Sequence, residues 1–271
     1  MAASDAIEGL VCGYPAAIRE RRCCVAVKVL HGYADDSADG GVYLLAGWVA
    51  TADAWIKFSE DFDRAKLPHS LHMKTARRKH GTRVNALAAI TCHRTLYRID
   101  CVLHPKNYEM TVKGKLRKEL DSPYFLLFYQ LILATARLLD LAKIDGAVNW
   151  IFDEQGKIGI EANSWYWWIK ERAKSNLKDR LGRTSVFDSD DVLLPLKAAD
   201  LYAWRLRRFL SQDQPAGLAP NLILESFLSK YGVSCNMTGE YLADLVEALN
   251  RGGLLLKANC QFFLPRGNSA R

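Results

Sequence analysis

The sequence predicts an α/β protein, because short runs rich in Val, Leu and Ala alternate with longer segments of helical periodicity. The longest apolar segment, residues 124–143, exceeds the length of a strand, so we expect it to form a buried central helix. Of the 271 residues, 49% are hydrophobic, which is enough to build the core of one large domain or two small ones. General disorder is therefore excluded.

Five segments have the composition of β-strands, and turn residues follow several of them. We expect these strands at residues 24–34, 42–50, 95–103, 147–152 and 185–187. The first strand should end in a turn that begins at Asp35 and contains Gly40 and Gly41. The first half of the chain is thus predicted to be rich in strands.

Five further segments are predicted to be helices, at residues 52–66, 84–92, 124–143, 158–174 and 195–209. Thr51 is a candidate N-cap for the first helix, in which Trp55, Phe58 and Phe62 share one face. Ser122 is a candidate N-cap and Pro123 a candidate first-turn residue for the helix at residues 124–143. Proline also opens the last of the five helices.

Three parts of the chain are predicted from these elements. Residues 1–22 would form an N-terminal arm, residues 23–212 the main domain, and residues 213–271 a linker followed by a small C-terminal helical extension. Residues 1–22 carry acidic side chains and no long apolar stretch, so we expect neither a signal peptide nor a membrane anchor.

The cysteines and charges indicate the class of protein. Seven cysteines, with no Cys-x-x-Cys motif, predict reduced thiols in a cytoplasmic protein without a zinc ribbon. The net charge of +7 permits attraction to polyanions, although such an excess is common on other proteins too. Basic residues gather at 77–80, 113–118 and 205–208, apart from acidic groups near residues 35, 153 and 188–191.

Acidic pairs follow two of the predicted strands. Asp35 and Asp36 follow the first, and Asp153 and Glu154 follow the fourth. If these strands are parallel neighbours, the carboxylates emerge at one edge of the sheet, where open α/β sheets bind their ligands. The alternative is that each pair solvates a loop, as Asp commonly does where a strand stops.

Asp200 lies on or beside the apolar face of the helix at residues 195–209. A buried carboxylate there needs a partner, which could be a cation, a hydrogen-bond donor or a metal ion shared with other carboxylates. A salt bridge to Arg207 or another arginine is the structural alternative.

Three motifs in this order resemble the domain of unknown function 3800 (DUF3800) family, which is grouped with ribonuclease H-like proteins. They are residues 33–48 with Tyr-Ala-Asp-Asp-Ser, residues 151–154 with Ile-Phe-Asp-Glu, and residues 194–204 with Leu-Pro-Leu-Lys-Ala-Ala-Asp-Leu. The resemblance covers about residues 25–209 and implies a ribonuclease H-like mixed sheet flanked by helices. Asp36 replaces the Glu usual in the family, and Lys197 replaces a Gln.

The resemblance also implies an acidic core of Asp35, Asp153 and Asp200, with Asp36 and Glu154 as further ligands or structural neighbours. Clustered carboxylates repel one another unless Mg²⁺ or Mn²⁺ neutralises them. Two such ions would activate a water molecule and stabilise the leaving oxygen of a phosphodiester. The sequence therefore predicts a metal-dependent nuclease acting on DNA or RNA.

Side chains around residues 72–79 and Lys197 are candidates for contacts with nucleic acid. His72 could shuttle a proton or support a phosphate, with an ordinary loop histidine as the alternative. Lys74, Arg77, Arg78, Lys79 and Lys197 could contact the phosphate backbone, although runs of charge are often simply solvated.

Other interpretations remain open at this point. The chain could be a non-catalytic nucleic-acid- or protein-binding module that keeps the fold, or its carboxylates could hold a structural cation. The aromatic run at residues 165–168 could stack on bases, but helical geometry favours packing for most of it. A homo-oligomer is also possible.

Overall fold

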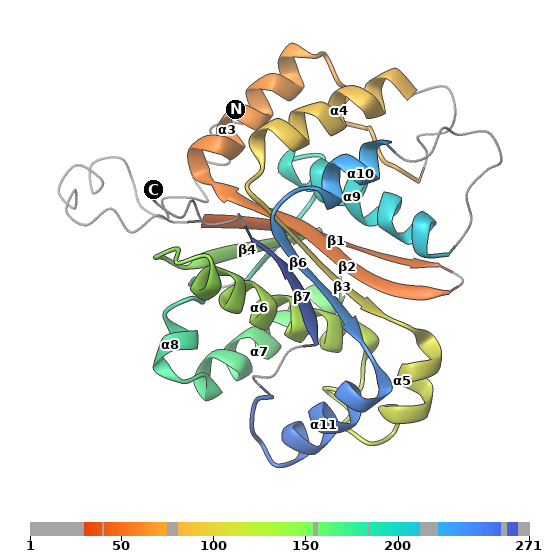
Figure 1. The fold of residues 1–271 in the computed structure, drawn as a ribbon, viewed down its shortest axis with the longest axis vertical. Coiled ribbons are helices and arrows are strands. Elements are labelled where there is room, and N and C mark those ends of the chain that lie inside the picture. Colours follow the sequence, from red (N-terminus) through yellow and green to blue (C-terminus); the bar gives the residue numbers. More distant parts are fainter. Residues whose placement is uncertain are drawn as a thin grey trace, which may run out of the picture.

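The computed structural model of the chain contains a seven-stranded sheet with helices on both faces (Figure 1). It describes residues 30–39, 41–74, 81–153, 157–183, 185–211, 222–255 and 259–264. The strands are β1 (Leu30–Asp39), β2 (Val42–Thr51), β3 (Tyr97–Leu103), β4 (Val148–Asp153), β5 (Val186–Asp188), β6 (Gly232–Met237) and β7 (Cys260–Phe263). Their order across the sheet is β5-β4-β1-β2-β3-β6-β7.

The sheet is mixed. Strands β1, β2 and β3 form an antiparallel meander, whereas β4 runs parallel to β1 and β5 runs parallel to β4. At the other edge, β6 runs parallel to β3 and β7 runs antiparallel to β6. The prediction of an α/β protein is confirmed, and each of the five predicted strands has a counterpart.

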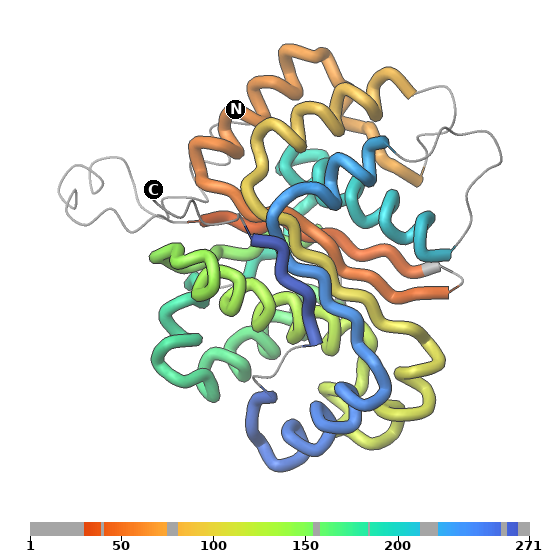
Figure 2. The backbone as a smooth tube through the Cα atoms, viewed as in Figure 1, coloured from red at the N-terminus to blue at the C-terminus, as the bar shows by residue number. Residues whose placement is uncertain are grey.

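The described helices lie in two layers, one on each face of the sheet (Figures 1 and 2). One layer contains α3 (Ala52–Arg64), α4 (Gly81–Arg94), α9 (Pro195–Leu210) and α10 (Leu222–Leu228). The other contains α5 (Pro105–Thr111), α6 (Pro123–Leu141), α7 (Lys157–Arg172), α8 (Ser175–Lys178) and α11 (Gly239–Asn250). Each layer buries a separate apolar cluster against the sheet.

Helix α6 is the central helix that the sequence predicts. It is apolar around almost its whole circumference and packs against β2, β3 and β6, with α7 beside it. Within the described part of the chain it is the one helix long and apolar enough to cross a membrane, but 78% of its apolar window is buried inside the protein. Its composition is that of a core helix.

Helix α3 begins as its sequence predicts. The Thr51 hydroxyl accepts a hydrogen bond of 3.3 Å from the Ala54 N–H, which satisfies one of the free donors of the first turn. Trp55, Phe58 and Phe62 are all buried on the face turned toward the sheet. The N-cap and the apolar stripe together fix this helix on β2.

The first strand is positioned differently from the prediction. The expected strand ended at residue 34, but β1 continues to Asp39 because β2 pairs with it as far as the Asp39–Val42 pair. Asp35 and Asp36 therefore lie within a strand and not in a turn. Gly32 faces the Trp150 ring so closely that a Cβ atom would lie 2.5 Å from it, which explains the glycine.

The prediction of a purely helical C-terminal extension is wrong. Strands β6 and β7 join the sheet beside β3, and α10 and α11 flank them on opposite faces. Val233, Cys235 and Met237 alternate with more polar residues and are buried, which is the period of a half-buried strand. The predicted arm at residues 1–22 and the linker at 214–220 lie outside the described residues.

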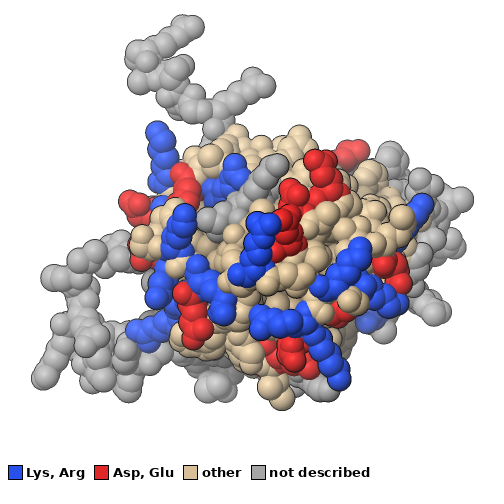
Figure 3. Space-filling view, turned by 90° about the horizontal axis from the view of Figure 1, so that it is seen from below, with Lys and Arg blue, Asp and Glu red and all other residues tan. Residues whose placement is uncertain are grey.

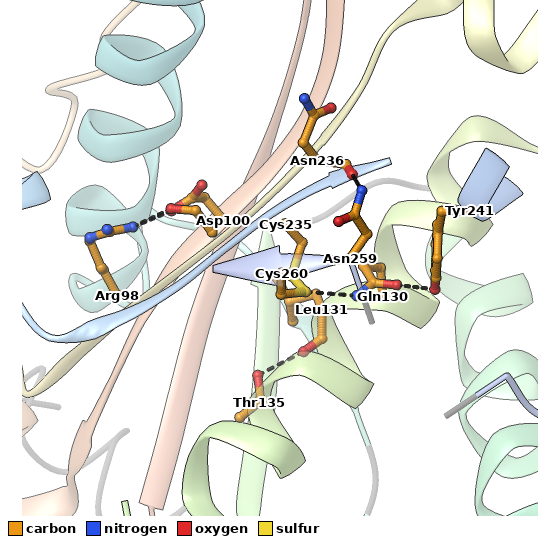
Figure 4. Close-up of a disulfide and its surroundings, with 11 residues drawn as sticks. Arg98, Asp100, Gln130, Leu131, Thr135, Cys235, Asn236, Tyr241, Asn259 and Cys260 are labelled. Atoms are coloured by element: carbon orange, nitrogen blue, oxygen red, sulfur yellow. Dashed lines mark hydrogen bonds and ion pairs between the residues drawn. A yellow bond between two sulfur atoms is a disulfide. The ribbon is translucent and has the colours of Figure 1, made fainter. Parts of the chain in front are cut away.

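Cysteines from three neighbouring strands lie in register. Cys101 on β3 pairs with Cys235 on β6, and Cys235 pairs with Cys260 on β7. Cys235 and Cys260 form a disulfide (Figure 4). Cys101 is a buried free thiol. The Gln130 amide donates to the Cys260 sulfur at 3.1 Å. The prediction that all cysteines are reduced is therefore wrong for this pair, because strand pairing brings together residues 25 apart in sequence.

Candidate functional site

Three carboxylates lie level with one another at the carboxyl ends of the parallel strands. Ala34 on β1 pairs with Phe152 on β4, and Phe152 pairs with Phe187 on β5. The next residue on each strand is an aspartate: Asp35, Asp153 and Asp188. Because successive side chains alternate between faces, all three point to the α9 face of the sheet. The predicted convergence of Asp35 and Asp153 therefore has its basis in strand register.

Helix α9 brings Asp200 over these strand ends. It packs across β1 and β2, and the Trp48 indole donates to the Ala198 carbonyl at 3.2 Å. The Asp200 Oδ2 atom accepts a hydrogen bond of 2.9 Å from the Met73 N–H. The sequence left open whether the partner of Asp200 is a cation, a hydrogen-bond donor or a metal ion, and the structure shows a hydrogen-bond donor. This bond also fixes the segment that carries His72 beside the carboxylates.

His72 and Asp190 complete one side of the site. His72 Nδ1 lies 3.1 Å from Asp190 Oδ2, and the His72 side chain is 43% exposed. The donor atoms of His72, Asp190 and Asp200 all lie within 4.8 Å of one another, which is a spacing that can hold a metal ion. His72 thus lies beside Asp200, although the two are far apart in sequence.

Lys197 does not have the position predicted for a nucleic-acid contact. Its side chain is fully buried, and its ammonium lies 2.8 Å from Asp190 Oδ2 and 3.3 Å from Asp191 Oδ1. The first turn of α9 faces the sheet, so Lys197 is directed inward, where a charge requires a partner. Its role is to hold the acidic segment that follows β5.

Burial and neighbouring charges disturb the acidity of Asp35. Burial raises the pKa of Asp35 well above its usual value, and the carboxylates of Asp200, Asp36 and Asp153 raise it further. The Asp36 N–H, which donates to Asp35 Oδ1 at 2.8 Å, opposes this effect. A nearby cation would therefore stabilise the charged form of Asp35.

The acidity of Asp200 is disturbed in the same direction. Burial raises the pKa of Asp200 to about 6, and Asp190 contributes to the increase. The Met73 N–H, Lys197 and His72 oppose it. At neutral pH this carboxylate carries a negative charge that its surroundings stabilise only in part.

These groups line a single pocket with a volume of about 440 Å³. Its lining residues come from β1, β4, α9 and the segments before α4 and α9: Asp35, Asp36, Ser37, Ala38, His72, Lys74, Asp153, Asp190, Asp200, Trp204 and Arg207. Acidic side chains dominate the part next to the sheet, whereas Lys74 and Arg207 add positive charge. The pocket can therefore accept a cation together with an anionic group.

Asp36 occupies a different position from Asp35, because its side chain alternates toward the opposite face of β1. Tyr124, at the start of α6, lies close to it. Burial raises the pKa of the Tyr124 phenol well above its usual value, and the negative charges of Asp36, Asp35 and Asp153 raise it further. Asp36 still contributes to the pocket lining. Its place fits a structural neighbour of the acidic group better than a principal ligand.

Several predicted site residues lie outside the described residues, namely Glu154, Arg77, Arg78 and Lys79. Lys74 is described and exposed, at the edge of the pocket. On the face seen in Figure 3, lysines and arginines are interspersed with acidic residues, without a large area of one sign. In the aromatic run, Trp165 is buried and Trp167 is 51% exposed.

Four residues in or beside the pocket were not predicted as site residues: Asp188, Asp190, Trp204 and Arg207, the last of which was considered only as a salt-bridge partner of Asp200. A signal was present for the first two, because the acidic run at residues 188–191 follows a predicted strand, as the other two acidic pairs do. For Trp204 and Arg207 there was only their spacing of four and seven residues from Asp200 on one helix. That spacing alone does not distinguish a pocket wall from a core.

Neither the protein-family models nor the curated proteins contain a match to this chain. The resemblance to the DUF3800 family therefore stays a prediction. The functional argument depends on the pocket itself.

The donor set fits a hard divalent cation. Carboxylate oxygens are the preferred ligands of Mg²⁺ and Mn²⁺, and two ligands at right angles around an ion with bonds of about 2.1 Å lie about 3 Å apart. His72 Nδ1 and Asp190 Oδ2 lie 3.1 Å apart, which is the distance of a direct hydrogen bond, and both side chains belong to the group spaced to hold an ion. Asp35 and Asp153 are not in the group of His72, Asp190 and Asp200 that is spaced to hold an ion, but they line the same pocket from the strand side.

Proposed function

We propose that the protein is a metal-dependent nuclease that hydrolyses phosphodiester bonds of DNA or RNA, with a ribonuclease H-like fold. The observation that carries this proposal is the convergence of Asp35, Asp153 and Asp200 from three separate elements into one pocket. The mixed sheet with helices on both faces supports the fold assignment and, with it, the resemblance to the DUF3800 family. The predictions of a cytoplasmic location, no membrane association and a possible homo-oligomer remain predictions.

The roles of the residues follow from their positions. Asp35, Asp153 and Asp200 would hold Mg²⁺ or Mn²⁺, which makes a bound water more acidic and neutralises charge on the phosphate. His72 is 43% exposed and lies beside Asp190, so its imidazole is placed to shuttle a proton during hydrolysis. Lys74 can hold a non-bridging phosphate oxygen at the edge of the pocket. The buried Lys197 holds Asp190 in place through an ion pair of 2.8 Å.

A metal titration with matched variants tests this function. Purified protein would be incubated with Mn²⁺ or Mg²⁺ and with DNA and RNA, as single strands and as duplexes. Asp35→Asn and Asp200→Asn should abolish cleavage, whereas Asp244→Asn, an exposed residue of α11 on the opposite layer, should not. Full turnover by either pocket variant would contradict the assignment.

One observation favours the second candidate, a non-catalytic binding module with a structural cation site. Lys197 already provides a buried positive charge to Asp190 and Asp191, so part of the acidic group is neutralised within the chain. In that case metal would raise the thermal stability of the protein without cleavage of any nucleic acid. The same titration, followed by thermal unfolding, separates the two candidates.

A further inference from the structure

One face of helix α9 carries three residues that line the pocket. Asp200, Trp204 and Arg207 are spaced by four and three residues, so their side chains lie above one another on the helix, and all three line the pocket. The residues between them, such as Tyr202 and Leu206, are buried in the core. This face therefore continues the proposed metal centre with an aromatic and a basic side chain.

Trp204 is only partly buried, and its ring already accepts flat cationic groups. The Arg208 guanidinium carbon lies 4.6 Å from the ring centroid and that of Arg205 lies 4.9 Å from it. Guanidinium groups stack on aromatic rings and on nucleobases alike. A nucleobase can therefore replace one of the two guanidinium groups on the Trp204 ring, while the other arginine keeps a positive charge beside the base.

The distribution of charge determines where a phosphate group can lie. The carboxylates that line the pocket repel a polyanion, whereas Arg207 and the exposed Lys74, which also line it, attract a polyanion. Lys74 is exposed and makes no hydrogen bond or ion pair with any described residue. A phosphate that approaches these carboxylates is thus flanked by two cationic side chains and by an aromatic ring.

We propose that the substrate presents an unpaired nucleotide at this pocket, with its base against Trp204 and its phosphate beside Arg207. This inference rests on the nuclease function above and specifies the class of nucleic acid. In a duplex, both faces of every base are covered by neighbouring bases, so only a single-stranded or displaced nucleotide can stack on a side chain. Trp204 and Arg207 are positioning residues for that nucleotide.

Binding measurements test the inference separately from catalysis. Fluorescence anisotropy with a labelled DNA or RNA single strand, and with the matching duplex, would be recorded in Ca²⁺ for the full chain. Trp204→Leu should weaken single-strand binding roughly tenfold, and Trp204→Phe should retain most of the affinity because a ring remains. Trp167→Leu makes the same change at an exposed tryptophan of α7 and should have no effect.

A second variant addresses the phosphate contact. Arg207→Gln should weaken binding of single strands and lower the slope of log affinity against log salt by about one, since one phosphate contact is lost. Circular dichroism would show that each variant is folded, and if Trp204→Leu does not fold, Arg207→Gln carries the test with Trp204→Phe as the folded variant that keeps its affinity. Weaker single-strand binding by Arg207→Gln, and by Trp204→Leu where it folds, supports the inference.

Results that contradict the nucleotide site can be distinguished from results that contradict the nuclease function. Unchanged single-strand affinity of folded Trp204→Leu, with metal-dependent cleavage by the natural protein intact, overturns the nucleotide site and leaves the nuclease standing. Tighter binding of duplex than of single strand by the natural protein overturns the substrate class. Absence of both binding and cleavage on every nucleic acid overturns the inference and the nuclease together.

Discussion

The electrostatics of the pocket predict that Asp200→Asn has opposite effects on stability with and without metal. In metal-free protein the folded-state pKa of Asp200 is about 6, compared with 3.8 as its ordinary value. A group of this kind binds more protons in the folded state between these two pH values, so its contribution to stability falls as pH rises from about 4 to 6. Above that window the folded protein carries the full penalty of the buried charge.

The size of the penalty follows from the shift in pKa. A difference of about two pH units corresponds to about 3 kcal/mol, since one unit is worth about 1.4 kcal/mol. Asparagine removes the charge but keeps an oxygen to accept the Met73 N–H. At pH 7.5 in a chelator, Asp200→Asn should therefore be more stable by up to about 3 kcal/mol, or roughly 6 °C in Tm.

Metal should reverse this order. At a concentration of Mn²⁺ one thousand times its Kd, the natural protein gains about 4.1 kcal/mol from binding, which exceeds the penalty of about 3 kcal/mol, whereas the variant has lost a ligand and gains less. Thermal unfolding in chelator and in Mn²⁺, at pH 4.5 and 7.5, measures the four combinations, with Asp244→Asn as the control. If Asp200→Asn is less stable than the natural protein in chelator at pH 7.5, the predicted penalty of burying the Asp200 charge is refuted.

Three further predictions concern groups outside the pocket. Asp100→Ala leaves the buried Arg98 guanidinium, now 2.6 Å from Asp100 Oδ2, without its partner, and should cost on the order of 3–5 kcal/mol in urea unfolding. The double variant Arg98→Met/Asp100→Leu should recover much of this loss, because no buried charge is left unpaired. If the double variant loses as much unfolding free energy as Asp100→Ala does, the unpaired charge is not the cause. Burial lowers the pKa of His31 to about 4, so the contribution of His31 to stability is present above pH 6.5 and is lost as pH falls toward 4. His31→Gln should flatten this acid-side decrease, and an unchanged slope would show that other groups cause it. Cys260→Ser should lower the free energy of unfolding by about 3 kcal/mol because the disulfide closes a loop between residues 25 apart. An unchanged urea midpoint without reductant would contradict this stabilisation.

Much of the local structure was predictable, because its signals lie within short segments. The Thr51 N-cap and the spacing of Trp55, Phe58 and Phe62 predict α3 within a few residues of its observed ends. The mostly apolar composition of α6 predicts a buried helix, and its charged residues Arg137 and Asp140 are exposed. By contrast, the end of β1 was misplaced, because pairing with β2 continues through Asp35 and Asp36, whose side chains are uncommon within strands.

The sequence by itself determined that helices and strands alternate and that Asp35, Asp153 and Asp200 are candidates for one acidic site. The first conclusion follows from residue type and periodicity, which are local properties of the chain, and the grouping of the three aspartates follows from the resemblance to the DUF3800 family. Only the tertiary structure decided that Asp190 and Trp204 join the pocket, that Lys197 turns inward, and that β6 and β7 extend the sheet. Each of these depends on strand register or helix packing between residues far apart in the chain, and such pairings are determined by the burial of the whole core, which no short segment encodes.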